Sequence, residues 1–110
     1  MSKQISFEYE NKPYVLEYTL RTAGQANDDG FILDQLGDKP ALMIPKLVYW
    51  AFVRHNRGIT RKQTDEIYQW IRDKSGFIAA LADMYADAVN SLIDDDDDEG
   101  EAGNANWTMS

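Results

Sequence analysis

The sequence predicts an α+β fold, mainly α, in which an N-terminal β-hairpin packs on about four helices and a disordered acidic tail follows. Three observations carry this prediction: a period-two alternation near the N-terminus, a nearly uncharged run over residues 41–53, and two amphipathic stretches after Gly58. At 110 residues the chain can bury one modest core. We therefore expect residues 1–93 to form a single folded domain and residues 94–110 to form the tail.

The hairpin is predicted from the alternation of apolar and polar side chains. Ile5, Phe7 and Tyr9 alternate with polar residues, which is the pattern of a half-buried strand. Residues 11–13 (Asn-Lys-Pro) favour a turn, and residues 14–20 continue as a second strand. Because an isolated hairpin is marginally stable in water, its apolar face must lie on the helices.

The segment between the hairpin and the central stretch gives weaker signals. Residues 22–29 include alanines, but also Gly24 and several residues that favour caps and turns, which predicts a short, frayed helix ending at Gly30. Residues 31–36 hold a small apolar cluster. This cluster fits either a third short strand or a single helical turn, and periodicity alone does not choose between them.

The central stretch, residues 40–57, is predicted to be a core helix. Between residues 41 and 53 only Lys46 is charged, so a helix here is apolar around almost its whole circumference. The run is shorter than a membrane span, which needs about 20 apolar residues. Asp38 is the expected N-cap and Gly58 the expected stop. Pro45 implies either that the regular helix starts near it or that the helix kinks there.

Two further helices are predicted after Gly58. Thr60 is a suitable N-cap for a helix over residues 61–74, and the break at residues 75–76 separates it from a helix over residues 77–93. The inward stripe of the first helix is expected at Ile67, Trp70 and Ile71. The inward face of the second is expected at Phe77, Leu81, Met84, Tyr85, Ala88 and Leu92.

Charge is unevenly distributed along the chain. The net charge is −8, and residues 94–101 hold seven of the 19 acidic groups, which leaves twelve acidic against eleven basic groups in residues 1–93. Such a balance argues against nucleic acid as a partner, and no stretch predicts contact with a membrane. The absence of cysteine and the single histidine exclude disulfides and a histidine metal cluster. We expect the protein to stay in the cytoplasm.

No residue pattern predicts catalysis. His55 lies at the C-terminal end of the predicted central helix and is explained there by the helix dipole, with no nucleophile suggested by spacing. Asp83 and Asp87 are four residues apart and resemble an ordinary solvated helix face. The aspartate run lacks the spaced ligands and turn glycine of a calcium loop. We therefore expect no enzyme activity, no cofactor and no metal.

The acidic tail is the first of two candidate partner-binding regions. It carries a cluster of carboxylates followed by an aromatic side chain that supplies large contact area. These residues are Asp94, Asp95, Asp96, Asp97, Asp98, Glu99 and Trp107. The alternative function is that of an acidic, DNA-mimicking inhibitor of a nucleic-acid-binding protein, for which carboxylates should also spread over the folded body.

Taken together, several segments resemble the small tail assembly chaperones of siphophages that infect Gram-positive bacteria. They are the hairpin FEYENKPYVLEYTLRT, the DGF segment, the DKPALMIPKL start of the central helix, the DEIYQWI helix and an acidic tail that contains NANW. The similarity runs over nearly the whole chain, and the order of the segments carries it.

The resemblance implies a non-catalytic protein made in the host bacterial cytoplasm. Members of that family coat the tape measure protein before the tail tube polymerises, help recruit tail tube protein, and are absent from the mature virion. Oligomers of this chain are compatible with that role. Because one small core can hardly enclose every side of the central helix, we expect Tyr49, Trp50 and Phe52 to contribute exposed surface for the client.

Overall fold

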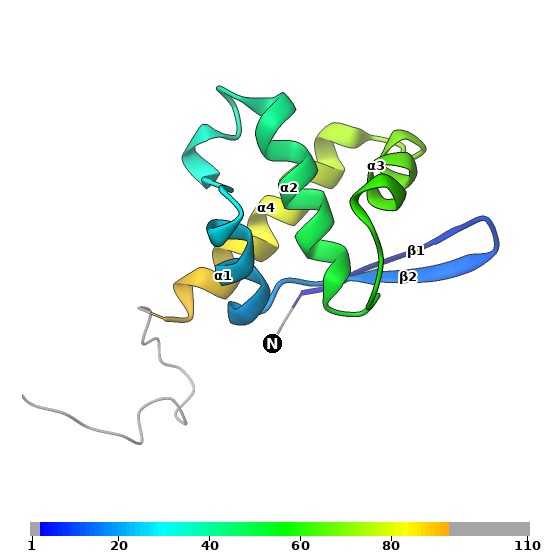
Figure 1. The fold of residues 1–110 in the computed structure, drawn as a ribbon, viewed down its shortest axis with the longest axis horizontal. Coiled ribbons are helices and arrows are strands. Elements are labelled where there is room, and N and C mark those ends of the chain that lie inside the picture. Colours follow the sequence, from blue (N-terminus) through cyan, green and yellow to red (C-terminus); the bar gives the residue numbers. More distant parts are fainter. Residues whose placement is uncertain (1–2, 93–110) are drawn as a thin grey trace, which may run out of the picture.

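The computed structural model of the protein describes residues 3–92. In chain order these form β1 (Ile5–Tyr9), β2 (Lys12–Leu16), α1 (Leu20–Asp28), the 3-10 turn η1 (Leu33–Gln35), α2 (Pro40–Val53), α3 (Arg61–Gln69) and α4 (Lys74–Asn90). These elements confirm the predicted α+β, mainly α fold. Figure 1 shows that the hairpin projects beyond the helices. The predicted tail, residues 94–110, lies outside the described residues.

The hairpin forms as an antiparallel pair with a two-residue turn. Tyr9 pairs with Lys12, and Glu10 and Asn11 between them have φ of 53° and 63°. Two consecutive positive φ values are typical of the tight turns whose twist matches the strands. The turn therefore lies at residues 10–11, so the prediction over residues 11–13 is correct at Asn11 and wrong for the next two residues; Pro13 lies within β2, opposite Glu8. A strand of a two-stranded sheet tolerates proline because its backbone needs only one set of ladder hydrogen bonds.

Helix α1 begins earlier than the sequence predicts, and it ends where predicted. Thr19 accepts a hydrogen bond from the Thr22 backbone N–H at 3.2 Å, and the Thr22 hydroxyl accepts one from the Thr19 N–H at 2.9 Å. This reciprocal cap ends the second strand at Leu16 and starts the helix at Leu20. Of the two alternatives left open for residues 31–36, the single helical turn is correct.

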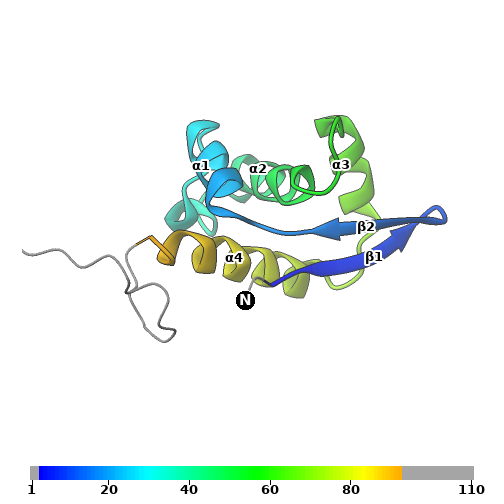
Figure 2. The ribbon, with the colours of Figure 1, turned by 90° about the horizontal axis from the view of Figure 1, so that it is seen from below.

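Helix α2 occupies the centre of the fold and packs against α1, α3, α4 and β2. In Figure 2, α1, α2 and α3 lie on one side of the molecule and α4 lies on the other. The helix begins at Pro40 and continues through Pro45, so it does not start near Pro45. Lys39 precedes it without a side-chain cap, so the expectation that Asp38 is the N-cap is wrong.

The ends of α3 and α4 differ from the prediction. Thr60 caps α3 as expected, in a reciprocal cap with Gln63, but α3 ends at Gln69. Trp70 is consequently 72% exposed and does not belong to the inward stripe. The Asp73 carboxylate accepts a hydrogen bond from the Gly76 N–H at 3.2 Å, so this glycine lies in the first turn of α4 instead of breaking a helix.

The hairpin is fixed to the helices by aromatic rings. Phe7 stacks on Tyr14 across the two strands, with ring centroids 5.7 Å apart. Both rings then meet Phe52 of α2 edge to face, at 6.1 Å and 5.7 Å, and Phe7 also meets Phe77 of α4 at 6.4 Å. Aromatic pairs at these separations and angles are favourable. The expectation that the apolar face of the hairpin lies on the helices is confirmed.

Candidate partner-binding surface

The candidate site is an open apolar groove along the first half of α2. It has a volume of about 350 Å³, and we call it the α2 groove. Its lining consists of Pro40, Ala41, Ile44, Pro45, Val48 and Tyr68. Every lining residue but Tyr68 comes from α2, and Tyr68 comes from α3. No charged side chain lines the groove, so it suits an apolar occupant.

The spacing of the lining residues explains why they share one flank of α2. Pro40, Ile44 and Val48 are four residues apart and therefore lie above one another on the helix. Val48 is only 1% exposed and forms the floor, Ile44 is half-buried, and Ala41 is exposed at the rim. Within residues 3–92, no segment covers this flank, so its apolar surface faces outward.

Tyr68 forms the wall of the groove opposite α2. Its ring lies against Phe77, with centroids 6.1 Å apart, and the Lys74 ammonium lies 5.5 Å from the ring centroid. The Tyr68 hydroxyl is protonated at neutral pH, as any tyrosine is, and partial burial raises its pKa further. The wall is therefore a positioned, uncharged ring.

Pro45 interrupts the backbone hydrogen bonding of α2 beside the groove. Proline has no backbone N–H, so the carbonyl of Ala41, four residues earlier, lacks its ordinary helical hydrogen bond. Both residues line the groove. The surface that lines the groove is nevertheless almost entirely apolar.

Phe52 is not part of any surface. Its side chain is 0% exposed, enclosed on the hairpin side by the rings of Phe7 and Tyr14. The expectation that Phe52 contributes exposed surface is wrong, because the hairpin covers the side of α2 on which Phe52 lies. The sequence of α2 is apolar almost all round, so it does not indicate which side the hairpin covers.

Tyr49 and Trp50 are half-buried and engaged within the fold. Their rings meet edge to face with centroids 4.8 Å apart, and the Arg61 guanidinium lies 4.4 Å from the Tyr49 ring centroid. The Trp50 indole N–H donates to the Asp29 carboxylate at 3.0 Å. Neither residue lines the α2 groove. Their proposed contact with a partner stays a prediction.

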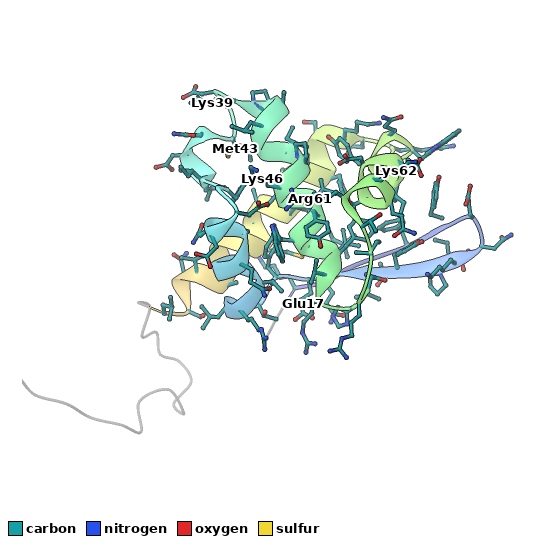
Figure 3. All side chains as sticks on the ribbon, in the orientation of Figure 1. Glu17, Lys39, Met43, Lys46, Arg61 and Lys62 are labelled. Atoms are coloured by element: carbon teal, nitrogen blue, oxygen red, sulfur yellow. The ribbon has the colours of Figure 1, made fainter. Side chains whose placement is uncertain are left out.

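Asp29, at the C-terminal end of α1, contacts side chains of both α2 and α3 next to this aromatic pair. Besides Trp50, it accepts a hydrogen bond from Arg61 and has Lys46 at 3.9 Å; Figure 3 shows Lys46 of α2 and Arg61 of α3 side by side. Partial burial acts to raise the pKa of Asp29, but the hydrogen bonds from Arg61 and Trp50 and the nearby positive charges hold it below its ordinary value. This network explains Tyr49 and Trp50 as structural residues.

The remaining predicted site residues lie outside the part of the chain that the structure describes. They are Asp94, Asp95, Asp96, Asp97, Asp98, Glu99 and Trp107. Within the described part, His55 bonds to Glu17 at 2.7 Å, and Asp83 and Asp87 hold Lys3 at 2.5 Å and 2.9 Å. Across residues 3–92 no helix is long and apolar enough to cross a membrane, and no group of three or more histidine or acidic side chains is arranged to hold a metal ion.

Comparison with known proteins places the chain in a family. A family model described as a domain of unknown function, DUF5055, matches residues 1–110. The chain belongs to the DUF5055 family. No curated protein and no solved structure matches this DUF5055 chain.

Sequence reasoning located the helix that bears the groove but not the groove itself. The signal was present, since two prolines five residues apart and a small alanine lie within an otherwise bulky apolar run. Prolines reduce the side-chain volume and the hydrogen bonding on one flank of a helix, which weakens its packing against neighbours. The sequence instead favoured the large rings of Tyr49, Trp50 and Phe52, and all three make contacts within the fold.

Proposed function

We propose that this protein is a non-catalytic phage tail assembly chaperone that binds and solubilises the tape measure protein in the host bacterial cytoplasm. It also helps recruit tail tube protein and leaves before the virion is complete. The observation that carries the proposal is the α2 groove, an uncharged apolar surface on a small protein that is otherwise rich in charge. The resemblance of the sequence to tail assembly chaperones supplies the identity of the client.

The groove suits a helical client. A tape measure protein is a long coil, and an amphipathic helix presents apolar anchors at every third or fourth residue, which dock into grooves of this kind. The client's apolar side chains would lie on Ile44, between the prolines and the Tyr68 ring. Each Å² of apolar surface that is buried in this way contributes about 25 cal/mol to binding. The buried surface of the client is then shielded from self-association.

The size of the groove also bears on stoichiometry. At about 350 Å³ it accommodates a few side chains of a client helix at a time. A long tape measure protein would therefore be coated by many copies of the chaperone, which fits a homo-oligomeric arrangement along the client. In this proposal the acidic residues 94–99 and Trp107 meet the tail tube protein.

The alternative of a DNA-mimicking inhibitor receives less support. A mimic of nucleic acid needs carboxylates distributed over its folded body. Residues 1–93 hold twelve acidic and eleven basic groups, which are intermixed along the chain. The groove, moreover, has no use in a protein that acts through charge alone.

The proposal is tested by co-expressing the full chain with the tape measure protein encoded in the same genome. Two variants are compared, Ala41→Glu at the rim of the groove and Leu42→Glu beside it. Both residues are exposed, both lie in the first turn of α2, and Leu42 does not line the groove. A glutamate in the first turn of a helix is tolerated by the helix dipole, so neither variant should unfold the protein.

We expect soluble tape measure protein to be recovered with the wild-type chain and with Leu42→Glu, and to be lost severalfold with Ala41→Glu. Circular dichroism checks that both variants keep the wild-type helical signal. Equal recovery with all three chains would remove the groove from the client contact. Failure of the wild-type chain to increase soluble tape measure protein at all would refute the function itself.

A further inference from the structure

Three arginines gather at the end of the molecule where α1 begins and α2 ends. Arg21 of α1 and Arg54 and Arg57, which follow α2, line one hollow of about 360 Å³. We call these three residues the arginine face. All three are exposed, and among residues 3–92 no carboxylate forms an ion pair with any of them.

The other cations on neighbouring elements are already engaged. Lys3 holds Asp83 and Asp87, and the positive charges of Lys46 and Arg61 face Asp29. His55 lies between two of the arginines in sequence, but its ring bonds to Glu17 instead. The arginine face is thus a concentration of positive charge left unneutralised by the described part of a chain whose net charge is −8.

The described part of the chain ends close to this face. Leu20 and Ser91 line the same hollow, so the end of α4 lies beside the start of α1, as Figure 1 also shows. Leu20 directly precedes Arg21, and Asp94 follows Ser91 by three residues. An extended chain covers about 3.3–3.6 Å per residue, so the six residues 94–99 can span about 20 Å.

We propose that the segment Asp94–Glu99 docks on the arginine face of its own chain. Its six carboxylates meet three guanidinium groups, which bind carboxylates in a two-pronged geometry. A single exposed ion pair contributes about 0–1 kcal/mol. Tethering to α4 converts the docking into an intramolecular event at high effective concentration, so several weak pairs suffice. The contact does not depend on which client, if any, the protein binds.

Paramagnetic relaxation in the full chain tests the docking directly. The sequence contains no cysteine, so Ala102→Cys introduces a single attachment point for a nitroxide just beyond the acidic segment. At low salt we expect the backbone amide signals of Arg21, Arg54 and Arg57 to lose intensity severalfold. Signals of Lys39 and Lys62, which Figure 3 shows at the other end of α2 and on α3, should be unaffected.

Three further samples, all carrying the nitroxide at position 102, decide what causes the broadening. In the triple variant Arg21→Gln, Arg54→Gln, Arg57→Gln the broadening should vanish, whereas Lys12→Gln, Lys39→Gln, Lys62→Gln removes the same charge and should keep it. At about 1 M salt, where the Debye length is about 3 Å, the broadening in the nitroxide-labelled chain with unchanged arginines should also vanish.

The source of the segment is settled by mixing isotope-labelled chains without nitroxide with unlabelled chains that carry it. Broadening confined to chains that carry their own nitroxide supports the proposal. Broadening in the mixed sample would assign the docked segment to a second copy and overturn docking within one chain. Uniform or absent broadening in all samples would overturn docking altogether.

Discussion

Both flanks of α2 are apolar in sequence, and they differ in what covers them. On one side Leu47, Ala51 and Phe52 are 0% exposed beneath the hairpin and the other helices. On the other, Pro40, Ala41 and Ile44 line an open groove. Hydrophobicity alone therefore does not separate the residues that hold the fold together from those left over for a partner. Tertiary contacts make that distinction.

The largest expected effect is on the covered flank. Phe52→Ala removes a fully buried ring and its contacts with Phe7 and Tyr14, so the free energy of unfolding should fall by about 3–5 kcal/mol. Urea unfolding followed by circular dichroism measures it. A loss below about 1 kcal/mol would mean that the covered flank is not the core, and the contrast between the flanks would disappear.

The network at Asp29 should make stability depend on pH. Because its pKa is lower in the folded than in the unfolded chain, the ionised carboxylate stabilises the fold at neutral pH, and this contribution is lost as pH falls from about 4 through the folded pKa. Asp29→Asn should cost about 1–2 kcal/mol at pH 7, with the difference from wild type shrinking in acid. A difference that stays constant from pH 7 to about 3 would contradict this assignment.

Much of the fold follows from local sequence rules. The alternation around Phe7, the cap at Thr60 and the apolar run after Lys39 correctly predicted the hairpin, the start of α3 and the central helix. Local rules failed where a side chain changes role with backbone conformation. Pro13 resembled a turn residue but lies in an edge strand. Gly76 was expected to separate two helices, but it lies in the first turn of α4, which Asp73, with a φ of 53°, caps.

The candidate site was less predictable for a physical reason. Sequence indicated that one side of α2 would stay uncovered, which the groove supports, but it pointed to the aromatic residues near the C-terminal end of the helix and not to the prolines and the alanine that line the groove. Large rings bury more apolar area than prolines or alanine, so the fold uses them first. Which flank remains open depends on where the hairpin and α3 dock, and neither docking position is encoded in the local pattern of α2.

On the open flank the expected loss is smaller. Ile44→Ala removes a half-buried side chain whose space is continuous with the groove, so no enclosed cavity results and the cost should be about 1 kcal/mol. Urea unfolding of Ile44→Ala and Phe52→Ala under the same conditions compares the loss in free energy of unfolding on the two flanks directly. Similar losses for the two variants would show that Ile44 belongs to the core and that the groove is closed in solution.

The smallest effect is expected at Trp70, which tests whether an exposed aromatic residue outside the groove matters to the fold. Its ring is 72% exposed, so Trp70→Ala should change the free energy of unfolding by less than about 0.5 kcal/mol. Ile67→Ala in the last turns of α3, where the residue is 3% exposed, should cost about 2–4 kcal/mol and serves as the matched control. A loss at Trp70 comparable to that at Ile67 would restore the inward stripe predicted from helical spacing. The expected inequality would instead show that α3 stops before its pattern does, leaving Trp70, like the rim of the groove, as apolar surface that the fold does not need.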